Sequence, residues 1–337
     1  MNYEETMDYL AALARFGVKP GLERTSALLD FVGRPQMRMR HVHIAGTNGK
    51  GSAAVMIEAV LRTAGYRTGL YTSPHLQRYT ERIRVCGQEI PRGELAALVT
   101  SLAPAVRRLA DDPSIGAPTE FEVATAACFQ WFASQGVEIA VVEVGLGGRY
   151  DSTNVVTPEV SVITHIAMDH MDKLGNTLGE IASDKAGIIK PDVPVVAGPQ
   201  QPEAMAVLEV AARRAGAPLT VVGRDVGFDV VSIDIKGTTV DMDLPSFGPV
   251  RVTTGLVGEH QAANCATAAT ALGVLAGIGS SPVVISLDDL RRGLAEAANP
   301  GRFEVVASDP FAVILDGAHN PDGARALAAT VERVLPG

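Results

Sequence analysis

The sequence predicts an α/β protein with a mostly parallel sheet and a small antiparallel β patch in its second half. Short apolar runs rich in β-branched residues alternate with helical segments, which is typical of parallel strands joined by helical crossovers. The first such run, HVHIAG, leads through a glycine-rich turn into a helical segment. Strand, glycine turn and helix therefore form the first structural unit.

Composition agrees with a folded protein. The chain has 337 residues, which suggests two domains at roughly 150 residues each. Hydrophobic residues make up 47% and charged residues 20%, too apolar a balance for a disordered chain. With 29 basic and 38 acidic residues the net charge is −9, which argues against a general nucleic-acid surface.

The first forty residues predict helices. Leu10, Leu13 and Phe16 recur at helical spacing, and residues 22–32 repeat a similar pattern after a Lys-Pro-Gly break. A strand at residues 41–46 and a helix at 52–64 follow.

The middle of the chain repeats this alternation. We expect strands at residues 138–144, 159–166 and 193–197, and helices at 120–134, 177–185 and 202–215. Their order predicts a sheet with right-handed crossovers.

The last third changes character. Short alternating runs across residues 227–256 predict an antiparallel patch appended to the sheet, and helices follow at 261–275 and 286–297. Asn299-Pro300-Gly301 is a linker candidate. A strand at 311–315 and a helix at 321–334 then begin a second α/β unit, too small to bury a core of its own.

The strongest chemical signal is the loop after the first strand. Its residues are Gly46, Thr47, Asn48, Gly49, Lys50, Gly51 and Ser52. Glycines let backbone N–H groups face phosphate oxygens, the helix N-terminus adds partial positive charge, and Lys50 reaches the outer phosphates. The common phosphate loop has Ser or Thr directly after its lysine to hold magnesium, whereas Gly51 stands here. Part of a metal shell must then come from elsewhere.

Three polar residues near the ends of later elements are further candidates. Glu143 ends a predicted buried strand, where it could meet magnesium or form a salt bridge. His170 follows the next strand, and its local pattern fits a hydrogen-bonding or structural histidine. Lys185, on a predicted helix, fits an ordinary solvated face.

Two further motifs stand at the ends of elements, the first with a structural interpretation and the second with a ligand-binding one. Thr119 and Glu122 form a capping box at the start of a helix, which explains both without a substrate. Asp316 follows the last predicted strand, a position where a nucleotide ribose can lie.

Taken together, the segments resemble the folylpolyglutamate synthase/dihydrofolate synthase family, a branch of the Mur ligase superfamily. The resemblance is carried in order by GLERTSALLDFVGRPQ, HIAGTNGKGS, YTSPHLQRYTERI, PTEFEVAT, VEVGLGGRYDSTN, ITHIAMDHMDKLGNTLGEIASDKAGIIK, GEHQAANCATA, NPGRFEVV and LDGAHNPDGARAL. It implies a P-loop, Mur-ligase-like central domain followed by a Rossmann-like domain. It also implies an ATP-dependent acid–amino-acid ligase that adds L-glutamate to folate or dihydropteroate through an acyl phosphate.

The resemblance assigns roles to the candidate residues. Lys50 and its loop should bind ATP, and Ser73, Glu143 and His170 should complete two magnesium sites. Lys185 matches a carbamylated lysine, although Asp184 precedes it where Glu is more usual. The other implied contacts are Asn264, Arg302, Asp316 and His319 with ATP, and His75, Arg82, Glu122 and Asp151 with the folate substrate.

The resemblance also divides the chain. Residues 1–298 correspond to the ATP-binding domain, and residues 299–337 to the linker and a truncated start of the glutamate-ligase domain.

Two alternative functions remain. A cell-wall Mur ligase would need a separate substrate domain before the loop, where only 45 residues stand; the short C-terminal part leaves open a nucleotide-binding module without ligase activity.

The sequence also leads to expectations about location and partners. The acidic start lacks the basic segment of a secretory signal, and no apolar run approaches the ~20 residues of a membrane span. Cys86, Cys128 and Cys265 lie far apart and form no metal-binding or disulfide pattern. We expect a cytoplasmic monomer acting on small molecules, with no nucleic-acid or membrane partner.

Overall fold

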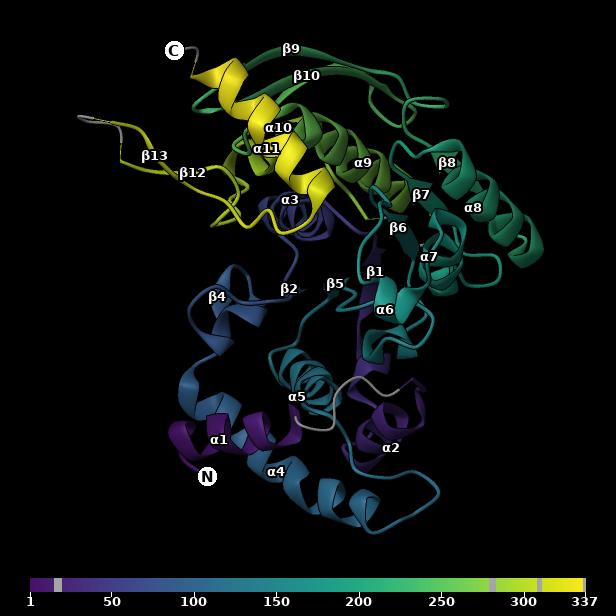
Figure 1. Ribbon diagram of the computed structural model, residues 1–337, viewed down its shortest axis with the longest axis vertical. Coiled ribbons are helices and arrows are strands. Elements are labelled where there is room, and N and C mark those ends of the chain that lie inside the picture. Colours follow the sequence, from purple (N-terminus) through teal and green to yellow (C-terminus); the bar gives the residue numbers. More distant parts are fainter. Residues whose placement is uncertain (15–19, 279–282, 308–310, 336–337) are drawn as a thin grey trace.

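The centre of the molecule is an eight-stranded sheet. The computed structural model describes residues 1–14, 20–278, 283–307 and 311–335. The strand order is β4-β3-β2-β5-β1-β6-β7-β8, with β3 and β4 antiparallel at one edge and the rest parallel (Figure 1). The strands are β1 (Arg40–Ala45), β2 (Thr68–Tyr71), β3 (Ile83–Val85), β4 (Gln88–Glu89), β5 (Ile139–Glu143), β6 (Val160–Ile163), β7 (Val195–Ala197) and β8 (Leu219–Val221).

Helices cover both faces of this sheet. On one face lie α3 (Lys50–Thr63), α9 (Glu259–Ala276) and α10 (Leu287–Glu296). On the other lie α1 (Tyr3–Ala14), α2 (Glu23–Phe31), α4 (Arg92–Ala110), α5 (Glu120–Ser134), α7 (Leu178–Lys185) and α8 (Pro202–Ala215). Alternate side chains of β5 explain the two cores: Val141 faces α3, whereas Ala140 and Val142 face α5.

Short helices occupy several connections. They are η1 (Pro35–Arg38), η2 (Tyr79–Arg82), η3 (Ser152–Val155), α6 (Met171–Leu174) and η4 (Ala186–Ile188). Within the described ranges, no helix is long and apolar enough to cross a bilayer.

The antiparallel patch is a sheet of its own, not the predicted extension of the large sheet. It consists of β9 (Phe228–Asp234), β10 (Gly237–Leu244) and β11 (Gly248–Thr254). Val240, Met242 and Leu244 alternate along β10 and are buried in the same core as α9. Burial of this apolar face against a helix, rather than pairing with β8, therefore decides where the patch lies.

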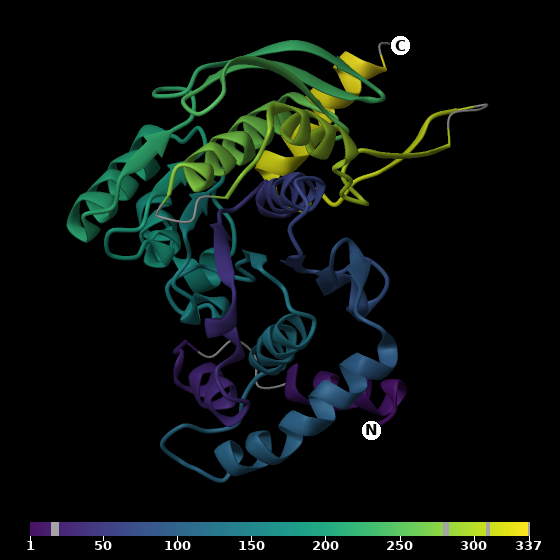
Figure 2. The same cartoon turned by 180° about the vertical axis from the view of Figure 1, so that it is seen from behind.

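The C-terminal segment contains a two-stranded ribbon and a helix. β12 (Glu304–Ala307) pairs antiparallel with β13 (Val313–Leu315), and α11 (Pro321–Val334) follows. The ribbon projects from the body, whereas α11 lies back against α9 and β9 (Figure 2). The predicted strand at 311–315 is thus shorter, and its partner β12 was not predicted.

The longer predicted elements are confirmed. The helices at 120–134, 202–215 and 321–334 have the predicted bounds. The short strands β2, β3, β4 and β8 were missed because two to four residues show no clear periodicity, and so was α4. Phe16, part of the expected first helix, lies outside the described residues.

Candidate active site

A cavity of about 530 Å³ opens at the carboxyl ends of β1, β5 and β6. This edge of a parallel sheet is the usual ligand position in α/β proteins. The predicted residues that line the cavity are Gly46, Thr47, Asn48, Gly49, Lys50, Gly51, Ser52, Ser73, Glu143, His170, Lys185, Asn264, Arg302, Asp316 and His319. The fold thus brings together every predicted nucleotide, metal and catalytic residue.

The glycine-rich loop joins β1 to α3. Gly49 has φ +92°, and a Cβ there would lie 2.2 Å from Oδ1 of Asn264, so this position requires glycine. The close approach brings α9 against the loop. Nζ of Lys50 donates hydrogen bonds of 3.1 Å to the carbonyl oxygens of Gly46 and Thr47.

Lys185 is buried next to this loop. Its side chain is 4% exposed, and Nζ donates a 2.8 Å hydrogen bond to the same Gly46 carbonyl. Burial and the nearby Lys50 charge lower the pKa of Lys185 to about 7, against the opposing effect of Asp184. The solvated-face interpretation is therefore wrong, because the fold turns this helix toward the cavity.

Glu143, the last residue of β5, is also buried. It is 4% exposed, and its carboxylate accepts a 3.1 Å hydrogen bond from the Ser73 backbone N–H. Burial raises the pKa of Glu143 to about 7, partly offset by Lys50, the Ser73 N–H and Arg302. A carboxylate in this setting is stabilised by a nearby cation.

The donor chemistry around Glu143 fits magnesium. Hard cations prefer oxygen ligands, and the Glu143 carboxylate and Ser73 hydroxyl supply them. A Cβ on Gly51 would lie 3.6 Å from Glu143 Oε2, so the loop runs directly past this carboxylate. Within the described ranges, no three His, Cys, Asp or Glu side chains form a metal-binding group. Other ligands of such an ion would have to come from hydroxyls, substrate or water.

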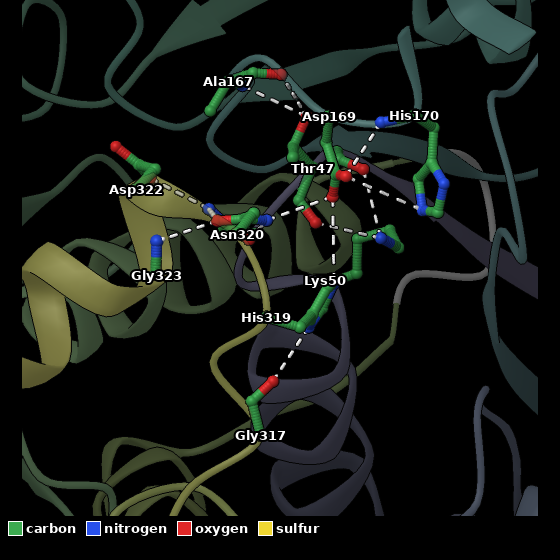
Figure 3. A network of polar contacts seen from close by, with 12 residues as sticks. Thr47, Lys50, Ala167, Asp169, His170, Gly317, His319, Asn320, Asp322 and Gly323 are labelled. Atoms are coloured by element: carbon green, nitrogen blue, oxygen red, sulfur yellow. Dashed lines mark hydrogen bonds and ion pairs between the residues drawn. The ribbon is translucent and has the colours of Figure 1, made fainter. Parts of the chain in front are cut away.

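His170 lies at the rim of the cavity beside Asp169. Its backbone is left-handed, with φ 47°, and its N–H donates a 2.8 Å hydrogen bond to Asp169 (Figure 3). Nε2 of His170 and Nε2 of His319 lie 3.9 Å and 3.8 Å from the Asp169 carboxylate. The Asp169 carboxylate therefore lies between its sequence neighbour His170 and His319, which comes from the C-terminal segment.

The C-terminal segment closes the other side of the cavity. Asp316 follows β13 and accepts 2.8 Å hydrogen bonds from the backbone N–H groups of Phe303 and Ala318. These bonds fix the turn that carries His319. A Cβ on Gly317 would lie 2.9 Å from a guanidinium nitrogen of Arg302, so Arg302 runs directly past this turn.

None of the four predicted substrate residues lines the cavity, and two of them, Glu122 and Asp151, have structural partners. Glu122 forms a buried ion pair of 2.9 Å with Arg24 and accepts a 2.6 Å bond from the Thr119 N–H, as the capping box predicts. Asp151 is buried, and its carboxylate accepts hydrogen bonds from the N–H groups of Leu146 and Thr153.

The other two belong to a cluster between Ser73 and β3. Nε of Arg82 donates a 2.9 Å bond to Nδ1 of His75, and Arg82 also pairs with Glu120 at 3.0 Å. Tyr79 completes the cluster: its ring lies 5.4 Å from that of His75, and its hydroxyl donates to Glu120. Burial and the Arg82 charge lower the pKa of His75.

The polar residues of the cavity region that sequence reasoning did not assign to the site include His165, Asp169, Asn320 and Asp322. Asn320 is the N-cap of α11, and an Asn before Pro at a helix start signals that cap. Nothing in the local sequence indicates that its amide also reaches the glycine-rich loop. That contact depends on two segments 272 residues apart.

Comparison with known proteins identifies the family of the chain. The family model of the Mur ligase middle domain matches residues 44–272. The dihydrofolate synthase/folylpolyglutamate synthase of Bacillus subtilis is 41% identical over 98% of this chain and 76% of its own length. Among solved structures, an FPGS–AMPPCP–folate complex has a TM-score of 0.92 at 37% identity, covering 100% of this chain and 82% of that one. Mycobacterium tuberculosis folylpolyglutamate synthase, in crystal structures with ADP and AMPPCP, has a TM-score of 0.88 at 38% identity, with 98% and 74% covered.

Proposed function

The chain belongs to the folylpolyglutamate synthase/dihydrofolate synthase family of the Mur ligases, and from this we propose that it joins L-glutamate to folate or dihydropteroate at the expense of ATP. The observation that carries the proposal is the single cavity in which the phosphate loop, Glu143, Lys185 and the C-terminal segment meet. The relatives' names and the nucleotide and folate complexes support the same reaction.

The chemistry explains why such a site is needed. A carboxylate is a poor acyl donor, so an oxygen of the folate carboxylate first attacks the γ-phosphorus of ATP and ADP leaves. The glutamate amine then attacks the acyl carbon, phosphate leaves, and the amine loses a proton. The cavity is bounded on one side by the C-terminal segment, and exclusion of water from it would protect the acyl phosphate from hydrolysis.

Lys50 and its loop hold the phosphates in this proposal. The Lys50 ammonium, which donates to two loop carbonyls in this structure, is placed to turn toward the outer phosphate oxygens. Asn264, Arg302, Asp316 and His319 bind the rest of ATP, because they line the cavity from α9 and the C-terminal segment.

Ser73, Glu143 and His170 hold two magnesium ions in this proposal. Bound magnesium would neutralise the negative charge that otherwise keeps ATP and the substrate carboxylate apart. The buried Glu143 carboxylate and the Ser73 hydroxyl are oxygen donors of the required kind, and His170 lines the same cavity.

Lys185 carries a carbamate in this proposal. Only a neutral amine attacks CO₂; the new N–C bond forms as one C=O π bond opens, and the nitrogen releases a proton to water. The pKa of Lys185, about 7 because of burial and Lys50, makes a neutral amine available near neutral pH. The resulting negative charge suits a site that contains Lys50 and magnesium.

We assign the folate substrate to the region beyond Ser73, around His75, Arg82, Glu122 and Asp151. His75 and Arg82 lie in the segment that continues from Ser73, so a substrate there can place its carboxylate in the cavity. Residues 1–298 form the ATP-binding domain, and residues 299–337 the linker and the start of the glutamate-ligase domain.

Quaternary state and location complete the proposal. The described cysteines are free, and Cys128 and Cys265 are buried, which fits a reducing compartment such as the cytoplasm. We propose a monomer, and light scattering on the purified protein measures its mass directly.

The decisive experiment offers the purified protein ATP, magnesium and L-glutamate with either dihydropteroate or tetrahydrofolate, and identifies the products by mass. We expect an acceptor whose mass grows by one glutamate residue, together with phosphate release that depends on glutamate. Lys50→Ala serves as the inactive control, because a loop lysine contacts ligand rather than core. ATP binding without glutamate-dependent phosphate release would replace this proposal with a nucleotide-binding module.

A further inference from the structure

The first turn of α11 is hydrogen bonded to the phosphate loop (Figure 3). The side-chain amides of Asn48 and Asn320 form two hydrogen bonds with each other. Nδ2 of Asn48 donates to Oδ1 of Asn320 at 3.3 Å, and Nδ2 of Asn320 donates to Oδ1 of Asn48 at 3.0 Å. Nδ2 of Asn48 also donates a 2.9 Å bond to Asp322. Both the oxygen and the nitrogen of the Asn48 amide are therefore hydrogen bonded to the start of a helix whose N-cap lies 272 residues later in the chain.

Asn320 joins a third segment to this contact. Its Nδ2 donates a 3.0 Å hydrogen bond to Asp169, which follows β6. Its Oδ1 accepts a 2.8 Å bond from the Gly323 N–H and so caps α11. With 7% of its surface exposed, Asn320 is held in one orientation by the helix that it caps.

Other hydrogen bonds already hold the loop against the segment that follows β6. The N–H groups of Thr47 and Asn48 donate to the carbonyl of His165 at 2.8 Å and 3.1 Å. The Thr47 hydroxyl bonds to Ala167 at 3.0 Å. The Asn48 side chain, in contrast, is hydrogen bonded to the C-terminal segment, and it lies two positions before Lys50.

We propose that Asn320 is a positioning residue for the nucleotide, which sets the phosphate loop in place when α11 docks against Asn48 and Asp169. The inference rests on the proposed function, because it takes ATP as the ligand of the loop. Asn320 acts through Asn48 and needs no contact with ATP itself.

The test is Asn320→Ser, which keeps a hydroxyl to cap α11 but is too short to reach Asn48 and Asp169. Loss of these hydrogen bonds should weaken nucleotide affinity at least roughly tenfold, which is about 1.4 kcal/mol. Calorimetry with a non-hydrolysable ATP analogue should show that loss. In the ligase assay KM for ATP should rise in parallel, while kcat changes less than about twofold.

The pair with Asn48 separates positioning from a general structural effect. If the two residues act through one contact, Asn48→Ala and the double variant Asn48→Ala/Asn320→Ser should bind the analogue equally weakly. Ser286→Ala is the matched control, since Ser286 caps α10 by accepting a 3.1 Å bond from the Asp289 N–H. That control should keep wild-type affinity. Effects that multiply in the double variant, or an Asn320→Ser protein that binds like wild type, would overturn the inference.

Hydrogen exchange without nucleotide tests the contact independently of catalysis. Asn48→Ala should speed deuterium uptake in the peptide that covers residues 320–327, although the substitution lies in another segment. If the wild-type protein binds no nucleotide, the proposed function fails and this measurement alone decides whether the contact holds α11. Unchanged exchange at residues 320–327 would show that it does not.

Discussion

At the scale of single residues, the cavity holds two buried ionisable groups with pKa values displaced in opposite directions. Burial raises the pKa of Glu143 to about 7 and, together with Lys50, lowers that of Lys185 to about 7. Burying each charge costs folding free energy in the ligand-free protein. In the proposed function Glu143 binds a cation and Lys185 carries a carbamate. The folding free energy lost by burying them is therefore an example of stability given up for function.

Glu143→Gln should raise the stability of the ligand-free protein at high pH. The folded carboxyl, with a pKa of about 7 against an ordinary 4.5, binds more protons than the unfolded one, so stability falls as pH rises through this window. The displacement corresponds to about 3 kcal/mol, fully expressed above pH ~7. Urea unfolding with a chelator should show Glu143→Gln more stable by up to that amount at pH 8, and equal to wild type near pH 4. Equal stability at both pH values would contradict the buried, unpaired carboxylate.

Lys185→Ala should lower ligase activity by about 10²-fold, the usual cost of removing one stabilising group from an active site. Short carboxylates such as acetate should restore part of it by occupying the place of the carbamate. Lys190→Ala is the matched control, because Lys190 is also partly buried, has a lowered pKa and donates to a backbone carbonyl, at 3.1 Å. It should keep near-normal activity with no response to acetate. A fully active Lys185→Ala enzyme would return Lys185 to a structural role.

At the scale of elements, the phosphate loop depends on close packing of the helix that follows it. α3 begins at Lys50 and packs against α10 at Gly293, where a Cβ would lie 2.4 Å from the Val60 Cα. No side-chain rearrangement relieves a clash with backbone. The contact distance between α3 and α10 therefore requires glycine at position 293.

Gly293→Ala should lower the free energy of unfolding by about 1–3 kcal/mol, the typical cost of overpacking. Arg292→Ala, one residue earlier on the exposed side of α10, should change it by less than about 0.5 kcal/mol. Chemical denaturation of the two variants provides the comparison. Equal stability would mean that α10 moves away from α3 at little cost.

At the scale of the whole molecule, the residues that form the hydrophobic cores and those that form the ligand site do not come from the same parts of the chain. Among the described residues, the three hydrophobic core clusters contain none after Ala297. Arg302, Asp316, His319 and Asn320 nevertheless belong to the cavity or its closing contact. Residues beyond the linker thus contribute more to the ligand site than to the core.

A chain ending at residue 298 should therefore fold and lose nucleotide affinity. Its thermal unfolding should remain cooperative, because the three cores are intact. Its affinity for an ATP analogue should fall at least tenfold, since removal of charged contacts and hydrogen bonds costs more than ~1.4 kcal/mol. Circular dichroism and calorimetry give the two answers separately. A shortened chain that fails to fold would refute the proposed division at residue 298.

The sequence by itself determined what contiguous residues encode. The glycine-rich loop between a strand and a helix, the capping box at Thr119 and the helix 321–334 needed only local spacing and turn chemistry. Glu143 was a candidate from its place at the end of a predicted buried strand, whereas the family resemblance gave roles to His170 and Lys185, whose own surroundings in the sequence are ordinary. Among the elements, the short strands and α4 were missed.

Only the tertiary structure decided burial and long-range contact. Lys185 lies on a helix whose pattern fits solvent, yet packing turns it onto the Gly46 carbonyl and lowers its pKa. Asn320 is a predictable cap, but its bonds to Asn48 and Asp169 exist because α11 lies back across the sheet edge. Local sequence sets which conformations a segment prefers, whereas the dielectric surroundings and partners of a side chain depend on residues far away in the chain.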